Sequence, residues 1–316
     1  MGLVEAIDLY KSYDEKAKEK SYAVQGVTLT IKQGETLGLV GESGCGKSTF
    51  GKLLLQLEKQ TSGKVLFKGQ DISNYNFHKM RPIRRNIQMI FQNSTNLFNP
   101  YFIVKQILME PVNNYFLHES DAEKEKRVRA ILHSVGLDES YLTRYGNELS
   151  GGQRQRIGIA RALILHPEFV VCDEVVSSVD YTMRNQILQL LMDLKEAFGL
   201  TYLFISHDLS AVQKVCDRVA VMYMGKVMEI LPSINARIKH PYTKALLDAT
   251  LDVNPRNREK QTMSLKETAE SESAIANEGC PYQNRCLLAQ DICKIHAPKL
   301  KNIGDDHAVA CHVVDH

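Results

Sequence analysis

A glycine-rich segment, Gly41–Ser48, combines residue types that bind phosphate groups, and we call it the phosphate loop. It reads GESGCGKS and fits the pattern G-x-x-x-x-G-K-[ST], between a short apolar run and a helical pattern. Glycines let backbone N–H groups turn toward phosphate oxygens, and the helix N-terminus adds partial positive charge. Lys47 is predicted to reach the β- and γ-phosphates, and Ser48 to offer its hydroxyl to Mg²⁺. The residues predicted to contact a nucleotide here are Gly41, Ser43, Gly44, Cys45, Gly46, Lys47, Ser48 and Thr49.

Two adjacent carboxylates, Asp173 and Glu174, directly follow the apolar run Phe169–Cys172. A buried strand would deliver Asp173 to a metal ion, and Glu174 would then polarise a water molecule for in-line attack on the γ-phosphate. Alone, such a pair more often marks a strand that enters a turn. Together with the phosphate loop it predicts hydrolysis of a nucleoside triphosphate.

The elements that must position these residues alternate along the chain. Short apolar runs alternate with helical patterns, which predicts an α/β domain. Residues 97–150 contain helical patterns and no convincing strand, so we interpret them as a helical insertion, and the basic run 79–85 as a solvated loop. Residues 217–230 are predicted to form two strands joined at Met224-Gly225. Other strands are predicted at 3–9, 22–31, 36–40, 64–68, 87–91, 169–172 and 202–205, and helix starts near Lys47, Asp121, Gly151, Met183 and Leu209.

The charge and the apolar pattern narrow the classes of function. The chain has 39 basic and 37 acidic residues, and this net charge of +2 gives no argument for binding nucleic acid or a membrane surface. No apolar stretch approaches the roughly 18 to 20 residues that span a bilayer. Residues 1–11 lack the basic segment and apolar core of a secretory signal. We therefore expect a cytoplasmic protein that reaches a membrane only through a partner and binds no nucleic acid.

The segment Leu149–Gln153, LSGGQ, is the most specific string in the sequence. A serine hydroxyl and glycine amides at a helix start form a binding site for an anion. Because the chain already has a phosphate loop for its own nucleotide, this second anion site suggests a second role. The segment resembles the signature motif of ABC ATPases, which caps the ATP held by a partner subunit. The resemblance implies a head-to-tail dimer with two ATPs at its interface, contacted by Ser150, Gly151, Gly152 and Gln153.

Other residues occupy the places of further ABC motifs. Gln92 resembles the glutamine that senses the γ-phosphate, and the resemblance makes it a Mg²⁺ ligand with Ser48 and Asp173. Ser177–Asp180 resembles the D-loop, whose Asp180 would contact nucleotide. His207 resembles the switch histidine that faces the γ-phosphate. The implied catalytic residues are Lys47, Gln92, Glu174 and His207.

Four residues leave alternatives open within this resemblance. Tyr13 is the first choice for stacking on adenine, and Tyr22 competes because residues 14–21 blur the spacing. Either residue can equally be a core tyrosine. Val175 stands where the family usually has proline, and Val179 where it usually has leucine. Neither change removes a catalytic group, so both bear on the placement of Glu174 and Asp180, and hence on the rate.

The resemblance covers essentially the whole chain and extends to one branch of the family. Three features resemble the oligopeptide, dipeptide and nickel importers, and specifically their second ATPase, the F subunit: Asn99-Pro100, the string His240–Leu246, and the ending from Gly279–Tyr282 through Asn284–Cys286 to Val309–His312. That implies a heterodimer with a second ATPase, two membrane permeases, an external substrate-binding protein and a place on the cytoplasmic face. Residues 92–101 would form the base of a groove for a permease helix. Peptide is the expected cargo, and nickel or a metal chelate the alternative.

The same resemblance implies a P-loop cassette with a RecA-like core, an antiparallel β subdomain and the helical insertion. The expected divisions are a cassette at 1–235, a connecting helix and linker at 236–279, and a tail at 280–316. A soluble ABC ATPase of translation or repair is disfavoured, because the chain holds one cassette and a short insertion. A non-hydrolysing cassette is disfavoured because Lys47, Glu174 and His207 are all present.

Four cysteines, Cys280, Cys286, Cys293 and Cys311, lie in the last 37 residues. A segment so short and poor in large apolar residues can hardly bury its own core, and a metal centre on four thiolates would stabilise it. Their spacing matches neither zinc fingers nor bacterial ferredoxins, and four reduced cysteines packed as small apolar residues are the alternative. Resemblance to importer ATPases with this tail favours a structural [4Fe–4S] cluster, with zinc second.

Overall fold

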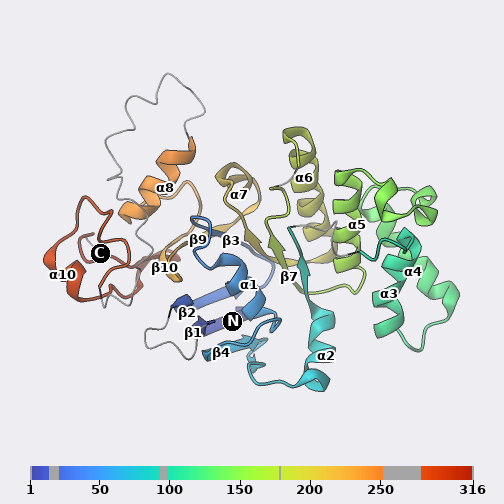
Figure 1. The fold of residues 1–316 in the computed structure, drawn as a ribbon, viewed down its shortest axis with the longest axis horizontal. Coiled ribbons are helices and arrows are strands. Elements are labelled where there is room, and N and C mark those ends of the chain that lie inside the picture. The colour runs from blue at the N-terminus through green and yellow to red at the C-terminus, as the bar shows by residue number, and fades with distance from the viewer. Residues whose placement is uncertain (1, 14–20, 93–97, 178, 252–278, 315–316) are drawn as a thin grey trace. The chain divides into compact units, whose positions relative to one another are not determined.

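The computed structural model describes residues 2–13, 21–92, 98–177, 179–251 and 279–314, and the chain divides into two compact units (Figure 1). The first unit comprises residues 1–31, 36–73 and 205–316, and the second comprises residues 32–35 and 74–204. Several predictions lie outside the described residues: most of the insert at 14–21, positions 93–97 of the predicted permease groove, Ser178 of the D-loop and residues 252–278 of the predicted linker.

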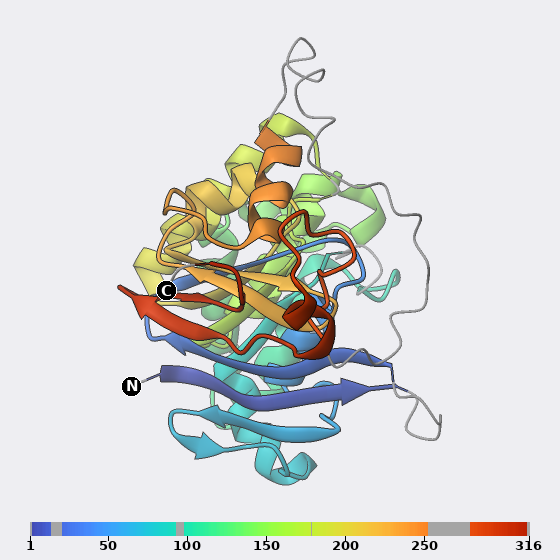
Figure 2. The same cartoon turned by 90° about the vertical axis from the view of Figure 1, so that its left-hand side faces the viewer.

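A four-stranded sheet forms one layer of the first unit, with strand order β2-β1-β4-β5 (Figure 2). Its strands are β1 (Gly2–Ser12), β2 (Tyr22–Lys32), β4 (Ser62–Phe67) and β5 (Gln70–Asp71), and β4 runs antiparallel to both β1 and β5. In β2, Val27, Leu29 and Ile31 are buried while the residues between them are exposed. This period of two is that of a sheet with one face toward a core.

Strand β3, which leads to the phosphate loop, belongs to a second sheet, of eight strands, and within it the strands of this unit follow the order β11-β12-β10-β9-β3. Strand β3 (Thr36–Val40) is fully buried and runs parallel to β9 (Arg218–Tyr223), which is antiparallel to β10 (Lys226–Leu231). Met224 and Gly225 join the last two with φ of 43° and 78°, the geometry of a tight hairpin turn. The predicted pair of strands is therefore confirmed. The helices of this unit include α1 (Lys47–Leu54), α7 (Leu209–Val215) and α8 (Pro241–Leu251).

The tail adds two strands that the sequence reasoning did not anticipate. Strands β11 (Lys301–Gly304) and β12 (His307–Val309) form a hairpin, and β12 pairs antiparallel with β10. Val309 and Ala310 are buried, and a short helix, α10 (Asp291–Ile295), precedes the hairpin. The tail thus buries apolar residues by extending an existing sheet. Three- and four-residue strands are too short for a periodic pattern to reveal them.

The second unit contains the strands β6 (Ile87–Ile90), β7 (Phe169–Asp173) and β8 (Thr201–Ile205), in the order β8-β7-β6. Strands β6 and β7 are parallel, and β7 and β8 are buried at every position. Such continuous apolar runs are typical of strands covered on both faces. Helices α5 (Gly151–Leu163) and α6 (Tyr181–Phe198) also belong here, and α6 begins two residues before the predicted Met183.

The basic run 79–85 lies in a helix, α2 (Phe77–Asn86), so its interpretation as a loop was wrong. Asn76 caps this helix by accepting the Lys79 N–H at 3.0 Å. Arg84 and Arg85 occupy the last turn, where positive charge interacts favourably with the helix dipole. Pro82 within the helix is the residue that obscured the pattern, because proline usually interrupts helices.

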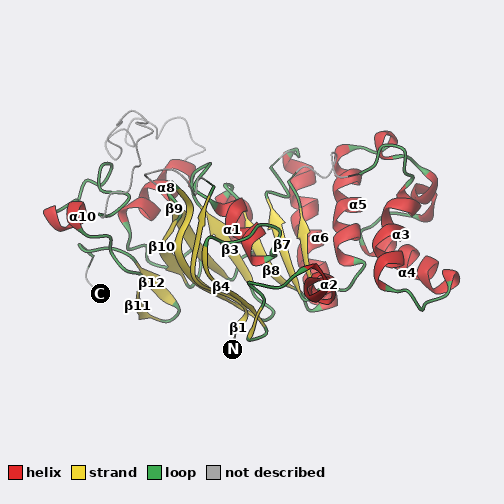
Figure 3. Ribbon diagram, turned by 60° about the horizontal axis from the view of Figure 1, so that its bottom comes forward, coloured by secondary structure: helices red, strands yellow, loops and turns green. Residues whose placement is uncertain are grey.

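The predicted insertion is helical. It contains α3 (Val104–Tyr115), α4 (Asp121–Ser134) and two 3-10 turns, η2 (Glu139–Thr143) and η3 (Gly146–Glu148) (Figure 3). Between residues 98 and 150 the only β contact is an isolated bridge between Ile103 and Tyr145. Capping by Ser120, whose hydroxyl accepts the Glu123 N–H while Glu123 accepts the Ser120 N–H, explains where α4 begins.

Candidate functional site

The phosphate loop requires glycine at two of its bends. It connects the buried β3 to the first turn of α1, and Gly41 and Gly46 have φ of 153° and 103°. A Cβ atom on Gly41 would lie 2.1 Å from the Met222 carbonyl oxygen, and one on Gly46 would lie 2.0 Å from that of Ala23. Any side chain at these positions would displace neighbouring backbone, so the glycines are what allows the loop to close over an anion.

The Lys47 side chain is enclosed by this loop, and the residue is only 5% exposed. Its ammonium donates to the carbonyl oxygens of Gly41 at 2.9 Å and Glu42 at 2.8 Å, and lies 3.7 Å from the Cys45 sulfur. Burial raises the pKa of the Cys45 thiol and so favours its protonated form, while the nearby Lys47 cation opposes this and lowers the pKa. The loop therefore holds a buried cation. When a nucleotide binds, the Lys47 ammonium can donate to phosphate oxygens in place of these carbonyl oxygens.

Tyr13 and Tyr22 differ in their surroundings. The Tyr13 side chain is 63% exposed, its hydroxyl donates to Glu58 at 2.6 Å, and it lies 3.3 Å from the Thr49 hydroxyl next to the phosphate loop. The Tyr22 ring instead packs edge-to-face against Tyr10 at 5.6 Å. An accessible ring beside the loop suits base stacking, so this geometry favours Tyr13 over Tyr22.

The structure brings Gln92 and Glu174 together in the second unit. The Gln92 side-chain amide donates to the Glu174 carboxylate at 2.7 Å, and the Ser177 hydroxyl donates to the Glu174 carbonyl at 2.9 Å. Glu174 has a φ of 47°, a conformation unusual for a residue with a side chain, and Asp173 just before it is 7% exposed. Strained backbone of this kind persists where the surroundings enforce it, often at functional sites.

The two departures from the family pattern have different surroundings. Val175 is 1% exposed, so its side chain packs in the core directly after Glu174. Asp180 caps α6 by accepting the Met183 N–H at 2.9 Å, which orients the end of the D-loop next to Val179. The turn after Glu174 and the cap of α6 therefore both form with valine at positions 175 and 179.

His207 follows strand β8, and its side chain is exposed. It belongs to the first unit, which also contains the phosphate loop. Asp208, the next residue, caps α7 by accepting the N–H groups of Ser210 at 2.9 Å and Ala211 at 3.3 Å. This cap determines where the chain turns after the strand and places His207 at the turn. Gln92, Asp173, Glu174, Ser150 and Asp180 all belong to the second unit.

The signature segment begins α5 with a reciprocal cap. The Ser150 hydroxyl accepts the Gln153 N–H at 3.3 Å, and the Gln153 side chain accepts the Ser150 N–H at 2.8 Å. The Gln153 amide also donates to the Tyr141 hydroxyl of η2 at 2.9 Å. Ser150 and Gly151 are exposed. The segment therefore presents the neutral Ser150 hydroxyl and the Gly151 backbone amide outward, at a helix start that the cap holds in place.

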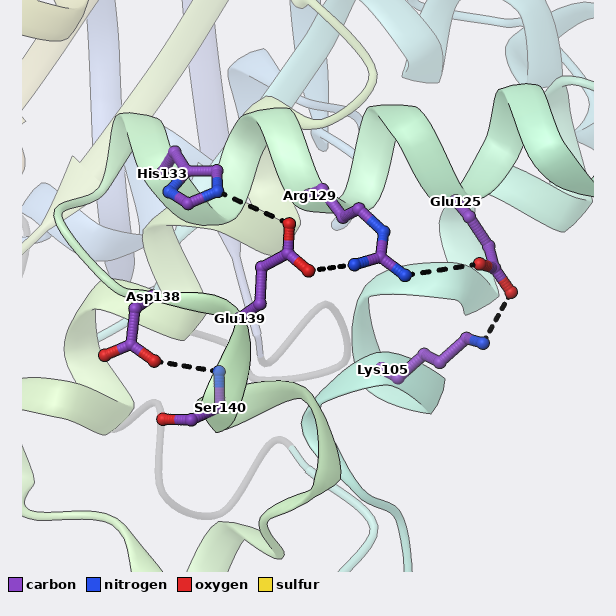
Figure 4. Close-up of polar contacts among 7 residues, drawn as sticks. All are labelled: Lys105, Glu125, Arg129, His133, Asp138, Glu139 and Ser140. Atoms are coloured by element: carbon purple, nitrogen blue, oxygen red, sulfur yellow. Dashed lines mark hydrogen bonds and ion pairs between the residues drawn. The ribbon is translucent and has the colours of Figure 1, made fainter.

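Ion pairs connect the elements of the insertion that precedes this segment (Figure 4). Lys105 of α3 pairs with Glu125 of α4, Glu125 with Arg129, and Arg129 with Glu139 of η2, which also lies 3.7 Å from His133. Each exposed pair contributes at most about 1 kcal/mol. Together they connect three elements of the insertion, one of which contacts Gln153 through Tyr141.

The four tail cysteines belong to the first unit and form no disulfide with one another. The pKa of Cys280 is raised to about 11, mainly by burial, with smaller contributions from the neighbouring Cys293, Cys311 and Cys286. Cys286 has a raised pKa for similar reasons. Within the described residues, no group of three or more His, Cys, Asp or Glu side chains is arranged to hold a metal ion. Of the four, Cys280 and Cys293 are adjacent through the backbone, because the Cys280 N–H donates to the Cys293 carbonyl at 2.7 Å.

Two residues that contact the phosphate loop were not anticipated. The Tyr242 hydroxyl of α8 accepts the Glu42 N–H at 3.1 Å, and Arg285 of the tail donates to the Glu42 carboxylate. They lie 200 and 243 residues away from Glu42 along the chain. The string His240–Leu246 pointed to this region only through resemblance, and no local pattern indicates Arg285.

Two family models match the chain. The model described as ABC transporter matches residues 24–177, and the one described as oligopeptide/dipeptide transporter, C-terminal region matches residues 224–293. The chain is 45% identical over 294 residues to the oligopeptide transport ATP-binding protein AppF of Bacillus subtilis, covering 92% of this chain and 89% of that one. It is 42% identical over 294 residues to a probable peptide ABC transporter ATP-binding protein, y4tS, of Sinorhizobium fredii, covering 92% and 82%.

Solved structures share the fold. The dimeric ATP-binding cassette MJ0796, bound to ADP and Pi, matches with a TM-score of 0.65 and 30% identity over 71% of this chain and 96% of that chain. The cbiO1 protein of Clostridium perfringens, part of an ABC transporter complex, matches with a TM-score of 0.66 and 27% identity over 73% and 88%. Among the described helices, none is both long and apolar enough to span a membrane. The chain has the ABC ATPase cassette fold and belongs to the ABC transporter family, in the branch that carries the oligopeptide/dipeptide transporter C-terminal region.

Proposed function

We propose that this chain hydrolyses ATP to power the import of peptides through a membrane permease complex. The hydrolytic part is carried by the contact between Gln92 and Glu174, 2.7 Å apart at the end of a buried strand. The cargo rests on relatives such as AppF, whose names state oligopeptide or peptide transport. Those names favour peptide over nickel, and the transport role over a soluble ABC ATPase.

In this proposal the phosphate loop holds the triphosphate through its amides and Lys47, and the accessible ring of Tyr13 stacks on adenine. Ser48, Asp173 and Gln92 present hydroxyl, carboxylate and amide oxygens, the hard ligands that suit Mg²⁺. Bound there, Mg²⁺ would neutralise charge on the phosphates. The remaining contacts come from Gly41, Ser43, Gly44, Cys45, Gly46 and Thr49.

Glu174 accepts hydrogen-bond donation from the attacking water and so orients it toward the γ-phosphate, with Gln92 holding the carboxylate. His207 donates toward the γ-phosphate and stabilises the charge that develops there. The exposed Ser150, Gly151 and Asp180, together with Gly152 and Gln153 of the same helix start, act on ATP held by a second subunit. The dimeric MJ0796 cassette, solved with ADP and Pi, supports this arrangement.

An ABC ATPase of this branch works as a dimer with membrane permeases. We propose further that its partner is a second, different ATPase, with two permeases and an external substrate-binding protein, and that it docks on the cytoplasmic face of the membrane. The groove for a permease helix is proposed at 92–101. The proposed divisions of the chain are the cassette at 1–235, with its helical subdomain at about 97–150, the connection at 236–279 and the tail at 280–316.

We also propose that Cys280, Cys286, Cys293 and Cys311 hold a [4Fe–4S] cluster, with zinc as the second choice. Thiolates are the ligands that both centres prefer. The backbone contact between Cys280 and Cys293, at 2.7 Å, supports a grouping of at least these two residues. Anaerobic purification followed by iron, sulfide and zinc analysis tests this, and less than one metal centre per four cysteines contradicts it.

The decisive test of hydrolysis is Glu174→Gln. We expect normal ATP binding and a turnover lower by roughly 10²- to 10⁴-fold, because the amide no longer acts as a base. Glu196→Gln, at an exposed position of α6, is the matched control. Wild-type hydrolysis by Glu174→Gln together with its natural partner ATPase would contradict the assignment. Co-purification with permeases, and loss of peptide uptake in cells that carry Glu174→Gln, test the transport part.

A further inference from the structure

The tail contacts the phosphate loop through one ion pair. The Arg285 guanidinium donates to both carboxylate oxygens of Glu42 at 2.9 Å each. The two side chains are 28% and 41% exposed, so the pair lies at the surface with part of it shielded. Glu42 is the second residue of the phosphate loop, and both residues belong to the first unit.

A cluster of tyrosines holds Arg285 in place. Its guanidinium lies over the rings of Tyr223 at 5.9 Å and Tyr282 at 5.7 Å, distances at which cations and aromatic faces attract. These rings also pack on Tyr242, whose ring centre lies 4.6 Å from that of Tyr223 and 5.3 Å from that of Tyr282. Tyr223, Tyr242 and Tyr282 are all at most 4% exposed. The guanidinium therefore rests on a rigid, buried support.

The same cluster orients the backbone of the loop. The Tyr242 hydroxyl accepts the Glu42 N–H at 3.1 Å, while the Glu42 carbonyl accepts from Lys47 at 2.8 Å. Glu42 thus connects the tyrosine cluster to the cation of the loop. Its carboxylate would be a liability there, because a negative charge beside a polyphosphate site repels the ligand. Arg285 provides the compensating positive charge.

We propose that Arg285 is a positioning residue that neutralises Glu42 and so raises the affinity of the phosphate loop for ATP. The proposal rests on the function proposed above for that loop, and it gives the tail a role at the nucleotide. It also distinguishes charge compensation from simple docking of the tail. Charge compensation predicts that removing both charges together restores the affinity for ATP, whereas docking predicts that the double variant binds as weakly as the variant without Arg285.

The test measures ATP affinity and steady-state hydrolysis by the full chain with its partner ATPase. For Arg285→Met we expect the Kd of a fluorescent ATP analogue, and KM, to rise about 3- to 10-fold, with kcat within about twofold. Glu42→Gln should bind ATP at least as tightly as wild type, and Arg285→Met in that background should have about the wild-type affinity, because the two changes together leave the net charge at this place unchanged. Arg285→Lys should restore most of the affinity. The loss should shrink at high salt, because salt screens an exposed pair.

Lys294→Met is the matched control, since Lys294 is a tail cation that pairs with Asp291 within α10. It should leave affinity unchanged. A double variant, Glu42→Gln with Arg285→Met, that binds ATP as weakly as Arg285→Met alone, or a loss in kcat alone, would overturn the proposal. If Arg285→Met does not fold, Arg285→Lys and Glu42→Gln still test it, because a weaker affinity in Glu42→Gln contradicts charge compensation. Wild-type affinity in Lys47→Ala would instead refute the assignment of the loop itself.

Discussion

The phosphate loop and the signature segment both lie at the start of a helix, yet they are built differently. The phosphate loop encloses a buried cation, Lys47, at bends that glycine alone allows. The signature segment presents the neutral Ser150 and Gly151 outward, and Gln153 completes its cap. A loop that encloses its own charge can bind an anion within one chain. A helix start that faces outward needs a ligand brought to it, which is the geometry that a dimer interface uses.

The supports of the two segments differ as well. Residues remote in sequence, Tyr242 and Arg285, contact the phosphate loop at Glu42. The signature segment is supported from nearby in the chain, through Tyr141 of η2 and through Arg156, which donates to the Val135 carbonyl at 2.6 Å. Changes in the tail should therefore alter nucleotide binding, whereas changes in the insertion should alter only the contribution to the partner.

The largest expected effect comes from removing the enclosed cation. Lys47→Ala should weaken ATP binding to this chain by about 100-fold, because charge-assisted hydrogen bonds to phosphate are lost. Equilibrium binding of a fluorescent ATP analogue measures it. Lys52→Ala, on the same helix and paired with Glu58 at 3.5 Å, is the control and should bind normally. An affinity within twofold of wild type would show that the loop does not depend on its cation.

A smaller effect is expected at the outward-facing segment. Ser150→Ala should leave ATP affinity at this chain's own phosphate loop unchanged and lower hydrolysis at the partner's loop by about 10- to 100-fold. The measurement uses the Lys47→Ala background, in which the hydrolysis that remains belongs to the partner. Ser134→Ala, at the end of α4, is the control. If affinity at this chain's loop falls instead, both segments act on one ATP and the comparison fails.

The features that the sequence predicts and those that it misses divide in the same way, into local patterns and contacts between residues remote in sequence. The sequence predicted strand β3, the phosphate loop and the start of α1 at the positions where the structure has them, because a buried strand and a glycine motif are local signals. Helix α2 was missed because Pro82 masks its pattern, and β12 because three residues carry no period. The pair of Glu42 with Arg285 was missed because no local rule predicts contacts across 243 residues.

The support behind the phosphate loop should be sensitive to acid. Burial lowers the pKa of His240 to about 4, and its ring nitrogen Nδ1 accepts the Tyr242 N–H at 3.0 Å. An unfolded histidine titrates near its usual pKa of about 6.5, so between roughly pH 6.5 and 4 the unfolded state binds more protons and stability falls as pH falls. From pH 7 to pH 5 this histidine should cost about 2 kcal/mol of unfolding free energy.

Urea unfolding at the two pH values measures this loss. His240→Asn should reduce it, because asparagine accepts the same N–H without titrating and suits a helix start. His118→Asn, at an exposed position, should keep the wild-type pH dependence. Equal pH dependence in wild type and His240→Asn would mean that the acid sensitivity arises elsewhere.

The smallest effect tests the support of the signature segment. Tyr141→Phe removes the hydroxyl that accepts from Gln153, and should lower the unfolding free energy by about 0.5 to 1 kcal/mol, because one hydrogen bond is lost. Hydrolysis at the partner's loop should fall less than about threefold, since the cap between Ser150 and Gln153 still forms. ATP affinity at this chain's own loop should not change. Tyr145→Phe, half-exposed in the same insertion, is the control. A loss of this chain's ATP affinity in Tyr141→Phe would show that the insertion supports both sites, and the division between a loop supported by the tail and a segment supported by its neighbours would not hold.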